Sequence, residues 1–384
     1  MFPPLDGQRV ERRVRREVVL QTTVGEVRVE AWYGRRRSDG QWIYPLKEVW
    51  ELGARETRSP ELKDRLAHII SLTGTFEEAA ALARRMDLPG DDSTLHTLAG
   101  RLGQECLNQL ELALDRPEAV DVPAAQHDPE DPLVVMMDGW MARFRGPDWG
   151  SGTDSQSQTA VLWQEVKMAV SYRLGQALEK GRRGWLSEKS LAIHRGQPLE
   201  FGRRMQHAAR RRGLGRARQV LVVADGAPWI WNLTADRLPE AQQCLDFYHA
   251  AEHVWDFAKA CWEEKAHCGR RWAKKERDAM KKGDVAGMIQ RMERLIQRDR
   301  VSPEHREVMA RCAEYFRSNQ SRMKYPEWRR QSWPIGSGAI ESACRGLQCR
   351  FKRPGQTWSP QGFDRLAALR AARSNGVWET VLTA

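Results

Sequence analysis

Two short apolar runs that each end in Asp-Gly constrain the fold of this 384-residue chain more than any other feature. The first run, Leu-Val-Val-Met-Met, leads into Asp138, and the second, Val-Leu-Val-Val-Ala, leads into Asp225. Continuous apolar runs of this length are typical of strands that are buried on both faces. A single Asp-Gly pair is most often only a turn. Two matched runs, however, predict two buried strands that bring their carboxylates to a common point.

A third carboxylate, Glu341, follows Pro-Ile-Gly-Ser-Gly-Ala-Ile just inside a predicted helix start. Ser337 is expected to cap this helix, and its free N–H groups would also suit a phosphate. A Glu in a first helical turn is often present only because it complements the helix dipole. Together with the two Asp residues, however, Glu341 completes an oxygen donor set that can hold a pair of Mg²⁺ ions, as in two-metal phosphodiester chemistry.

The order of the predicted elements around these residues indicates the fold class. Three strands, a helix, a strand, a helix and a strand follow one another, with strands at 133–145, 163–173, 185–194, 219–225 and 243–249 and a helix at 200–212. This order predicts an α/β fold with a ribonuclease-H-like catalytic core, in which helices flank a mixed five-stranded sheet. A charged helical insertion interrupts the core, and one apolar stripe marks it: Val285, Met288, Ile289, Met292, Leu295 and Ile296.

The rest of the chain divides by composition. A β-rich segment with turns at Gly25 and Asp39-Gly40 is followed by a helical region, in which Thr75 and Glu78 form a capping box. A stretch rich in Pro and acidic residues then forms a linker. The predicted domains are a β-rich segment at 1–50, a helical region at 51–114, a linker at 115–132, a catalytic domain at 133–265 and 333–384, and an insertion at 266–332.

The helical region before the linker contains two short amphipathic helices joined by a tight turn, as in a helix-turn-helix. In that motif the second helix enters the major groove of DNA. The residues that would face DNA are Ser93, Thr94, His96 and Arg101. An ordinary helical hairpin is the alternative.

The charge of the chain favours a polyanionic partner. Sixty-two Lys and Arg residues against 51 Asp and Glu residues give a net charge of +11. Two basic clusters flank the carboxylates, one at Arg210, Arg211 and Arg212 and the other at Arg345, Lys352 and Arg353. Trp358 lies among the second cluster and is expected to stack on an unpaired base. The alternatives are solvated helix faces for the charges and a packing role for the tryptophan.

Four separated motifs resemble those of a known family. They are the run that ends in Asp138-Gly, Val-Val-Ala-Asp-Gly-Ala-Pro-Trp-Ile at 222–230, Leu-Asp-Phe-Tyr-His at 245–249, and Trp-Pro-Ile-Gly-Ser-Gly-Ala-Ile-Glu-Ser-Ala at 333–343. In this order they resemble a DDE transposase of a bacterial insertion sequence, of the ISKra-type group related to Mutator-like transposases. The closing stretch from Phe351 to Trp358 also fits that family. The resemblance covers most of 133–384.

The resemblance implies roles for particular residues. Asp138, Asp225 and Glu341 would be the metal-binding triad, and Asp246 and His249 would form a signature beside the active site. His249 could equally be a hydrogen-bonded core histidine. The expected cofactor is Mg²⁺, with Mn²⁺ able to substitute. Zinc is not expected, because the Cys and His spacings fit no common zinc module and the N-terminal β region lacks cysteine pairs.

The function expected from these observations is that of a DNA transposase. It would bind the terminal inverted repeats of its element as a dimer or larger assembly, cleave double-stranded DNA and join the ends to target DNA. The alternatives are a nuclease of the same fold that only hydrolyses, or a domesticated DNA-binding protein without turnover. With no apolar stretch of about 18 residues, no signal peptide and seven scattered cysteines, the expected location is the cytoplasm, at the nucleoid and away from membranes.

Overall fold

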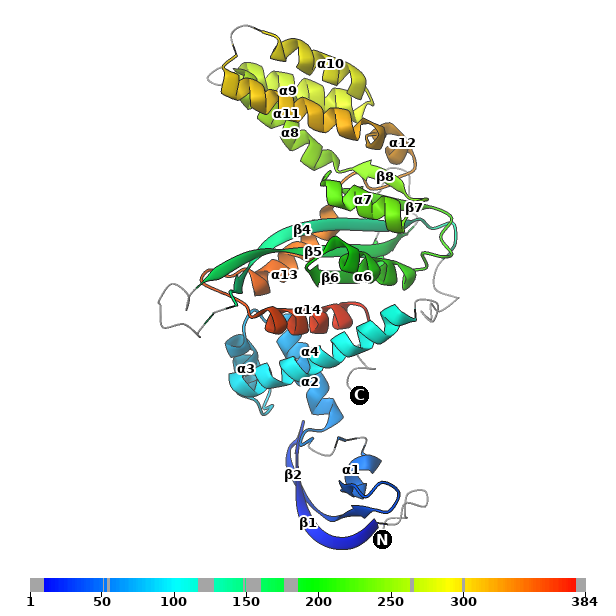
Figure 1. Ribbon diagram of the computed structural model, residues 1–384, viewed down its shortest axis with the longest axis vertical. Coiled ribbons are helices and arrows are strands. Elements are labelled where there is room, and N and C mark those ends of the chain that lie inside the picture. Colours follow the sequence, from blue (N-terminus) through cyan, green and yellow to red (C-terminus); the bar gives the residue numbers. More distant parts are fainter. Residues whose placement is uncertain are drawn as a thin grey trace. The chain divides into compact units, whose positions relative to one another are not determined.

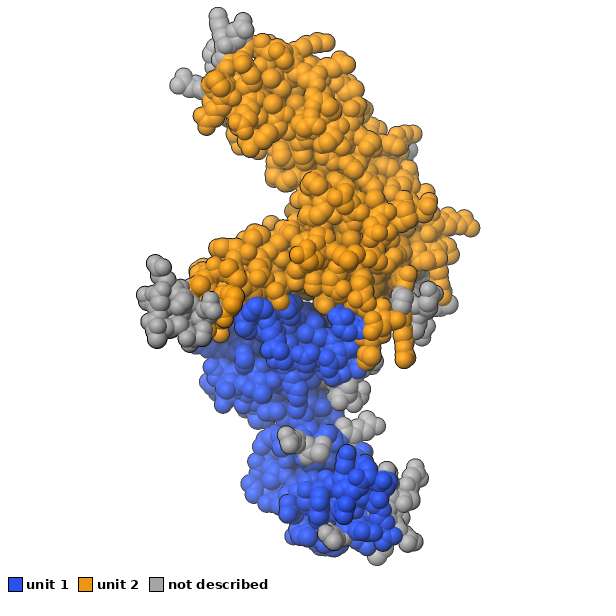
Figure 2. Space-filling view, in the orientation of Figure 1, with its two compact units in different colours: residues 1–111, 359–384 blue, residues 112–358 orange. Residues whose placement is uncertain are grey.

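The computed structural model divides the chain into two compact units, drawn in blue and orange in Figure 2. Unit 1 comprises Met1–Glu111 and Ser359–Ala384, and unit 2 comprises Leu112–Trp358. The structure describes residues 10–50, 52–53, 56–116, 128–147, 149, 160–175, 186–262, 266–298 and 301–377. Within these ranges, every helix is too short or too polar to pass through a lipid bilayer.

Unit 1 begins with a three-stranded antiparallel sheet, which lies within the segment expected to be β-rich. Its strands are β1 (Val10–Thr22), β2 (Gly25–Arg36) and β3 (Trp42–Ile43), in the order β1-β2-β3. The β1–β2 turn depends on Gly25, whose φ of +112° is strained for any other residue. A short helix, α1 (Pro45–Val49), follows the sheet. Val18, Leu20, Ala31 and Leu52 form the small core of this part.

Four longer helices complete unit 1 (Figure 1). They are α2 (Pro60–Leu72), α3 (Phe76–Arg85), α4 (Asp92–Asp115), whose residues from Leu112 on are assigned to unit 2, and, from the far end of the chain, α14 (Pro360–Ser374). The predicted capping box is confirmed, because Thr75 Oγ1 accepts the Glu78 N–H at 2.9 Å and Glu78 Oε2 accepts the Gly74 N–H at 2.8 Å. The second helix of the predicted pair is a single helix of 24 residues rather than a short one. Most of the predicted linker that follows it lies outside the described residues.

Unit 2 contains a mixed five-stranded sheet with helices, which is an α/β arrangement. The strands are β4 (Leu133–Arg145), β5 (Val161–Leu174), β6 (Leu186–Arg195), β7 (Val220–Ala224) and β8 (Gln242–Leu245). Their order is β6-β5-β4-β7-β8, with β4, β5 and β6 antiparallel and with β7 and β8 parallel to β4. Helix α6 (Pro198–Arg210) packs on β5 and β6, and α7 (Pro228–Arg237) packs on α6. The five predicted strands are thus present.

One predicted boundary is wrong. The strand expected at 243–249 ends at Leu245, and α8 (Phe247–Trp262) begins two residues later. The reason is Asp246, whose Oδ1 accepts the N–H groups of Tyr248 at 2.6 Å and His249 at 3.0 Å. A carboxylate that satisfies free N–H groups in this way starts a helix. His249 therefore lies on a helix and not at a strand end.

The region between β8 and the last helix of unit 2 is helical, as predicted. After α8 come α9 (Ala266–Lys281), α10 (Val285–Ile296), α11 (Pro303–Asn319), a 3-10 turn at Gln320–Arg322 and α12 (Tyr325–Arg330). The apolar stripe predicted for this region is buried on α10, except for the half-buried Ile296. Helix α13 (Gly338–Phe351) then returns to the sheet and packs on β4 and β5.

The end of the predicted catalytic segment 333–384 divides between the two units, since α13 belongs to unit 2 and α14 to unit 1. Compactness alone does not establish which segments fold or act together. The domain boundaries expected from the sequence therefore stay a prediction.

Candidate active site

The two aspartates belong to neighbouring parallel strands, Asp138 within β4 and Asp225 directly after the end of β7. Met136 of β4 lies opposite Val223 of β7, and Asp138 and Asp225 each follow two residues later. Parallel strands lie about 4.8 Å apart and advance at the same rate, so residues equally far along them stay side by side. Both aspartates are half-buried. The register of β4 and β7 thus brings together two residues that the sequence separates.

The turn after β7 is held from two sides. Asp225 Oδ1 accepts the Ala227 N–H at 3.0 Å, and the Tyr315 hydroxyl of α11 donates to the Asp225 carbonyl at 2.7 Å. Gly226 has a φ of +101°, and a Cβ atom there would lie 2.9 Å from the Tyr315 ring. Only glycine fits this turn without moving the tyrosine. The insertion therefore contacts the main chain of Asp225 directly.

Glu341 lies in the first turn of α13 and is exposed. The buried Cys344, one turn further along α13, places its Sγ 3.6 Å from Met168 Sδ on β5. Side chains three apart share a helix face, so the face that bears Glu341 is turned towards the sheet. Ser337 occupies the N-cap position but makes no side-chain cap bond, contrary to the expectation. Its hydroxyl instead donates to Glu341 Oε1 at 2.8 Å and orients that carboxylate.

Asp138 is influenced electrostatically by the other two carboxylates. Burial raises the pKa of Asp138, and the negative charges of Asp225 and Glu341 raise it further. Two contacts oppose this, since the Gly139 N–H and the Cys344 thiol stabilise the ionised carboxylate. Like charges raise a carboxyl pKa only where they lie near it. Asp138 thus lies within electrostatic reach of both Asp225 and Glu341.

Asp246 joins the two chain segments that carry the site. It is 1% exposed, and its Oδ2 accepts the Ser337 N–H at 2.6 Å while Oδ1 caps α8. The Phe247 N–H also donates to the Ile335 carbonyl at 2.8 Å. These bonds tie the segment before Glu341 to the end of β8. Both carboxylate oxygens of Asp246 are occupied by backbone N–H groups, which suits a positioning role.

His249 lies in the first turn of α8, half-buried, with Nδ1 3.4 Å from Glu252 Oε2. The ring of His253, one turn later, stacks on Tyr315 with centroids 3.9 Å apart. Burial lowers the pKa of His253, and the charge of His249 lowers it further. The His253 ring thus supports Tyr315 by stacking, while the ring of His249 stays partly accessible.

The donor set at this edge fits a hard divalent cation. Among the described residues, no three His, Cys, Asp or Glu side chains form a ready-made metal cluster. Mg²⁺ does not need one, because it binds through one or two carboxylates, keeps several waters and uses substrate phosphates. Burial is the main cause of the raised pKa of Asp138, and a bound cation would relieve the part of the rise that comes from the charges of Asp225 and Glu341. Asp138, Asp225 and Glu341 offer only oxygen ligands, which Mg²⁺ and Mn²⁺ prefer.

The residues expected to face DNA in the N-terminal region occupy the first turns of α4 in unit 1. Ser93 and His96 are exposed and Thr94 is half-buried, and the edge of the His96 ring packs against Phe76. Arg101 is exposed but forms an ion pair with the buried Glu56 at 2.6 Å. Ser93 and His96 remain accessible, whereas Arg101 also has a structural partner.

The arginines of the first basic cluster are largely buried or bonded within the protein. Arg212 is 9% exposed and donates to Ser190 Oγ at 2.8 Å and to the Lys189 carbonyl at 3.0 Å. Burial lowers the pKa of Arg211, and the charge of Arg212 lowers it further. Arg210 is half-buried. Arg212 thus anchors β6, and its expected contact with DNA has no support in its surroundings.

The second cluster is more open. Arg345, Lys352 and Arg353 are exposed on α13 and just after it. Trp358 is half-buried, its ring packs on Phe351 with centroids 5.0 Å apart, and its indole N–H donates to the Phe351 carbonyl at 3.0 Å. This geometry is that of a packing residue, and its stacking on a base stays a prediction.

Tyr315 is a residue near the site that the sequence did not indicate. It reaches Asp225 from a helix 90 residues further along the chain, and no motif surrounds it. Its contact depends on how α11 packs against α8. Only a three-dimensional arrangement could reveal it.

Comparison with known proteins gives a limited result. The profile of a family described as an uncharacterised protein family (UPF0236) matches residues 208–381, which is less than half of the chain. The match includes Asp225 and Glu341 and omits Asp138. No curated protein matches the chain. A solved structure, "Drosophila P element transposase strand transfer complex", is similar at 13% identity and a TM-score of 0.29, over 83% of this chain and 80% of that chain, a likeness too low to support an argument.

Proposed function

We propose that this chain is a DDE transposase with a ribonuclease-H-like catalytic core. The observation that carries the proposal is the register of β4 and β7, which puts Asp138 and Asp225 at one level of adjacent strands. The packing of α13, which turns the face of Glu341 towards β5, supports it. The strand order β6-β5-β4-β7-β8 agrees with the fold that the sequence motifs imply.

Each residue of the site has a proposed task. Asp138, Asp225 and Glu341 would hold Mg²⁺, with Mn²⁺ as a substitute. When bound, the metal would activate the attacking oxygen and neutralise charge on the phosphate. Ser337 holds the Glu341 carboxylate in one orientation through its hydroxyl. Asp246 holds the α13 lead-in against β8 and acts as a positioning residue rather than a catalytic one.

The proposed chemistry consists of two in-line displacements. In the first, a water oxygen forms a bond to phosphorus at the element end, and the bond from phosphorus to the 3′-oxygen breaks. His249, whose ring is accessible, is the proposed donor of the proton that the leaving oxygen takes up. In the second, the freed 3′-hydroxyl attacks a phosphodiester of target DNA, and a target 3′-hydroxyl leaves.

DNA recognition would use regions outside the carboxylates. The first turns of α4 are proposed to read the terminal inverted repeats, and Arg345, Lys352 and Arg353 to contact backbone phosphates. The enzyme would act as a dimer or larger assembly that holds two element ends. It would work in the cytoplasm, at the nucleoid.

The test of this function is the fate of labelled element-end DNA incubated with the protein, Mg²⁺ and a target plasmid. A transposase gives nicked ends and also covalently joined products. Nicked ends without joining would indicate the hydrolytic nuclease of the same fold. Binding without either product would indicate a domesticated DNA-binding protein and contradict the proposal.

A further inference from the structure

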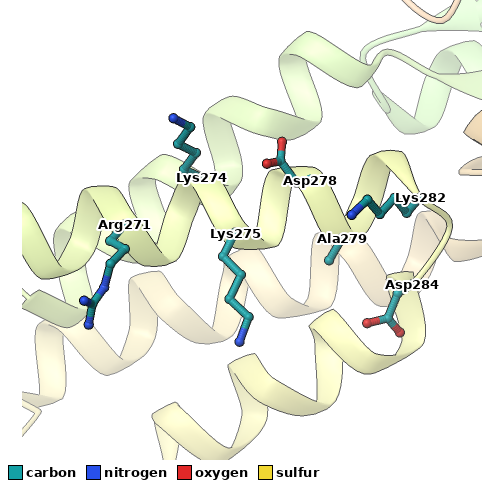
Figure 3. A pocket seen from close by; sticks show the side chains of 7 residues that line it. All are labelled: Arg271, Lys274, Lys275, Asp278, Ala279, Lys282 and Asp284. Carbon is teal, nitrogen blue, oxygen red and sulfur yellow. The ribbon is translucent and has the colours of Figure 1, made fainter.

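A hollow of about 540 Å³ lies along α9 and the start of α10 (Figure 3). Four cationic and two acidic side chains line it: Arg271, Lys274, Lys275, Lys282, Asp278 and Asp284. None of the tasks proposed above uses it. Its charge, its rigidity and its open shape together indicate a ligand.

Both carboxylates of the hollow are already engaged by other groups. Asp284 forms an ion pair with Arg291 at 3.0 Å, and its Oδ1 accepts the Gly287 N–H at the start of α10. Asp278 accepts from Arg277 at 3.3 Å. By contrast, no carboxylate of the described residues forms an ion pair with any of the four cations that line the hollow, and all four are exposed. The hollow therefore presents uncompensated positive charge.

The opposite face of α9 fixes the helix in place. Ala273, Glu276 and Met280 are fully buried, and the Trp272 ring stacks on Phe257 of α8 with centroids 5.0 Å apart. Glu276 receives three hydrogen bonds from the Arg291 guanidinium. A helix held in this way presents its outer side chains from a rigid backbone.

The spacing of the cations suits an extended polyanion. Lys274 and Lys275 lie three and four residues after Arg271, and Lys282 follows Lys275 by seven residues, which are spacings close to whole helical turns. At 1.5 Å per residue the row spans about 16 Å, which is the length of about five base pairs along one strand of duplex DNA. A small organic ligand needs an apolar enclosure, whereas this hollow is open and every residue that lines it except Ala279 is charged.

We infer that the hollow on α9 binds the phosphate backbone of duplex DNA, without reading its sequence. The inference rests on the proposed function, because that function makes DNA the substrate. It adds a binding surface on the helical insertion to those that flank the carboxylates. An acidic protein segment is the rival occupant, and the experiment separates the two.

The experiment measures binding of fluorescent element-end duplex and of random duplex to the full-length protein by anisotropy, at several salt concentrations. The test variant combines Lys274→Gln, Lys275→Gln and Lys282→Gln. Each phosphate contact contributes about 0.9 to the slope of log affinity against log salt concentration. The triple variant should therefore lower that slope by about 2 to 3, equally for both duplexes. Replacing the same lysines by Arg should restore it.

A matched control removes the same charge elsewhere on the insertion, with Arg294→Gln, Arg311→Gln and Arg329→Gln, three exposed arginines. This control should leave the slope within about 0.5 of the wild-type value. Thermal unfolding is measured for every variant to check that the fold is kept. A slope unchanged by the lysine triple, or one changed as much by the control, would overturn the inference. So would lysine-dependent binding of polyglutamate in preference to DNA.

Failure of the inference and failure of the proposed function give different results. Wild-type protein that binds DNA through the lysines but never cuts it would contradict the function and support the hollow. If the protein cuts and joins DNA but the lysine substitutions do not change its salt slope, only the inference about the hollow is contradicted. Protein that binds no DNA would overturn both.

Discussion

Asp246→Asn is the substitution that most sharply separates positioning from catalysis in this site. The carboxylate accepts three backbone N–H groups, from Tyr248 at 2.6 Å, His249 at 3.0 Å and Ser337 at 2.6 Å. Asparagine keeps one oxygen, which can still cap α8. Its amide nitrogen would then face the Ser337 N–H, so that donor meets donor. The change therefore removes the tie to α13 while it preserves the helix start.

The magnitude follows from the bond that is lost. A hydrogen bond to a charged group contributes about 1.5–3 kcal/mol, and a buried N–H left without an acceptor costs a similar amount. Because a buried negative charge is itself costly, removing it offsets part of this loss of stability. We expect a net loss of about 2–3 kcal/mol in the free energy of unfolding of unit 2. That corresponds to a urea midpoint lowered by about 1 M.

The assay follows unfolding in urea by tryptophan fluorescence and, on the same samples, single-turnover cleavage of element-end DNA. Asp246→Asn should lower both the urea midpoint and the cleavage rate. Ser337→Ala is the matched comparison, because it removes only the hydroxyl that orients Glu341. It should lower the cleavage rate and leave the midpoint almost unchanged. A wild-type midpoint and rate for Asp246→Asn would refute the positioning role.

Three further substitutions test other parts of the account. Tyr315→Phe removes the hydrogen bond to the Asp225 carbonyl, which contributes about 1 kcal/mol. The substitution should slow cleavage about fivefold and leave DNA affinity unchanged. An unchanged cleavage rate would show that the contact is incidental. Arg291→Met leaves the Glu276 carboxylate buried without its partner. The free energy of unfolding in urea should fall by about 3–5 kcal/mol. A second substitution, Glu276→Met, should largely recover this loss, whereas additive losses would contradict the account. Burial lowers the pKa of His207 to about 4. Its contribution to the free energy of unfolding is therefore present above pH 6.5 and is lost as the pH falls towards 4, by roughly 2 kcal/mol. His207→Phe should remove this pH dependence, and a stability profile parallel to that of the wild type would disprove it.

The strands of unit 2 could be predicted because their residues show the pattern that buried strands require. The apolar runs before Asp138 and Asp225 are of the length and composition typical of strands that are buried on both faces. The end of β8 could not be predicted, because Asp246 is equally compatible with the last position of a strand and with the cap of a helix. Its second bond, to the Ser337 N–H, joins residues 91 positions apart, which no local pattern gives.

The site itself was only partly predictable. The motifs indicated which carboxylates belong together, but the register of β4 and β7 and the packing of α13 had to be seen in three dimensions. The basic residues illustrate the opposite error. Arg212 lies in a charged run that suggested DNA contact, yet its neighbours in space, Ser190 and Lys189, take up its donors. Charge runs say nothing about which side of an element faces solvent.

The most direct test of the central claim is single-turnover cleavage in Mg²⁺ by Asp138→Asn, Asp225→Asn and Glu341→Gln, with DNA affinity measured in parallel. The matched control is Asp236→Asn, an exposed carboxylate on α7. We predict that each of the three loses at least about a thousandfold in rate, about 4 kcal/mol, while binding DNA as wild type does, and that the control keeps full activity. Cleavage within tenfold of wild type by any one of the three would contradict the assignment of that carboxylate and the site built on it.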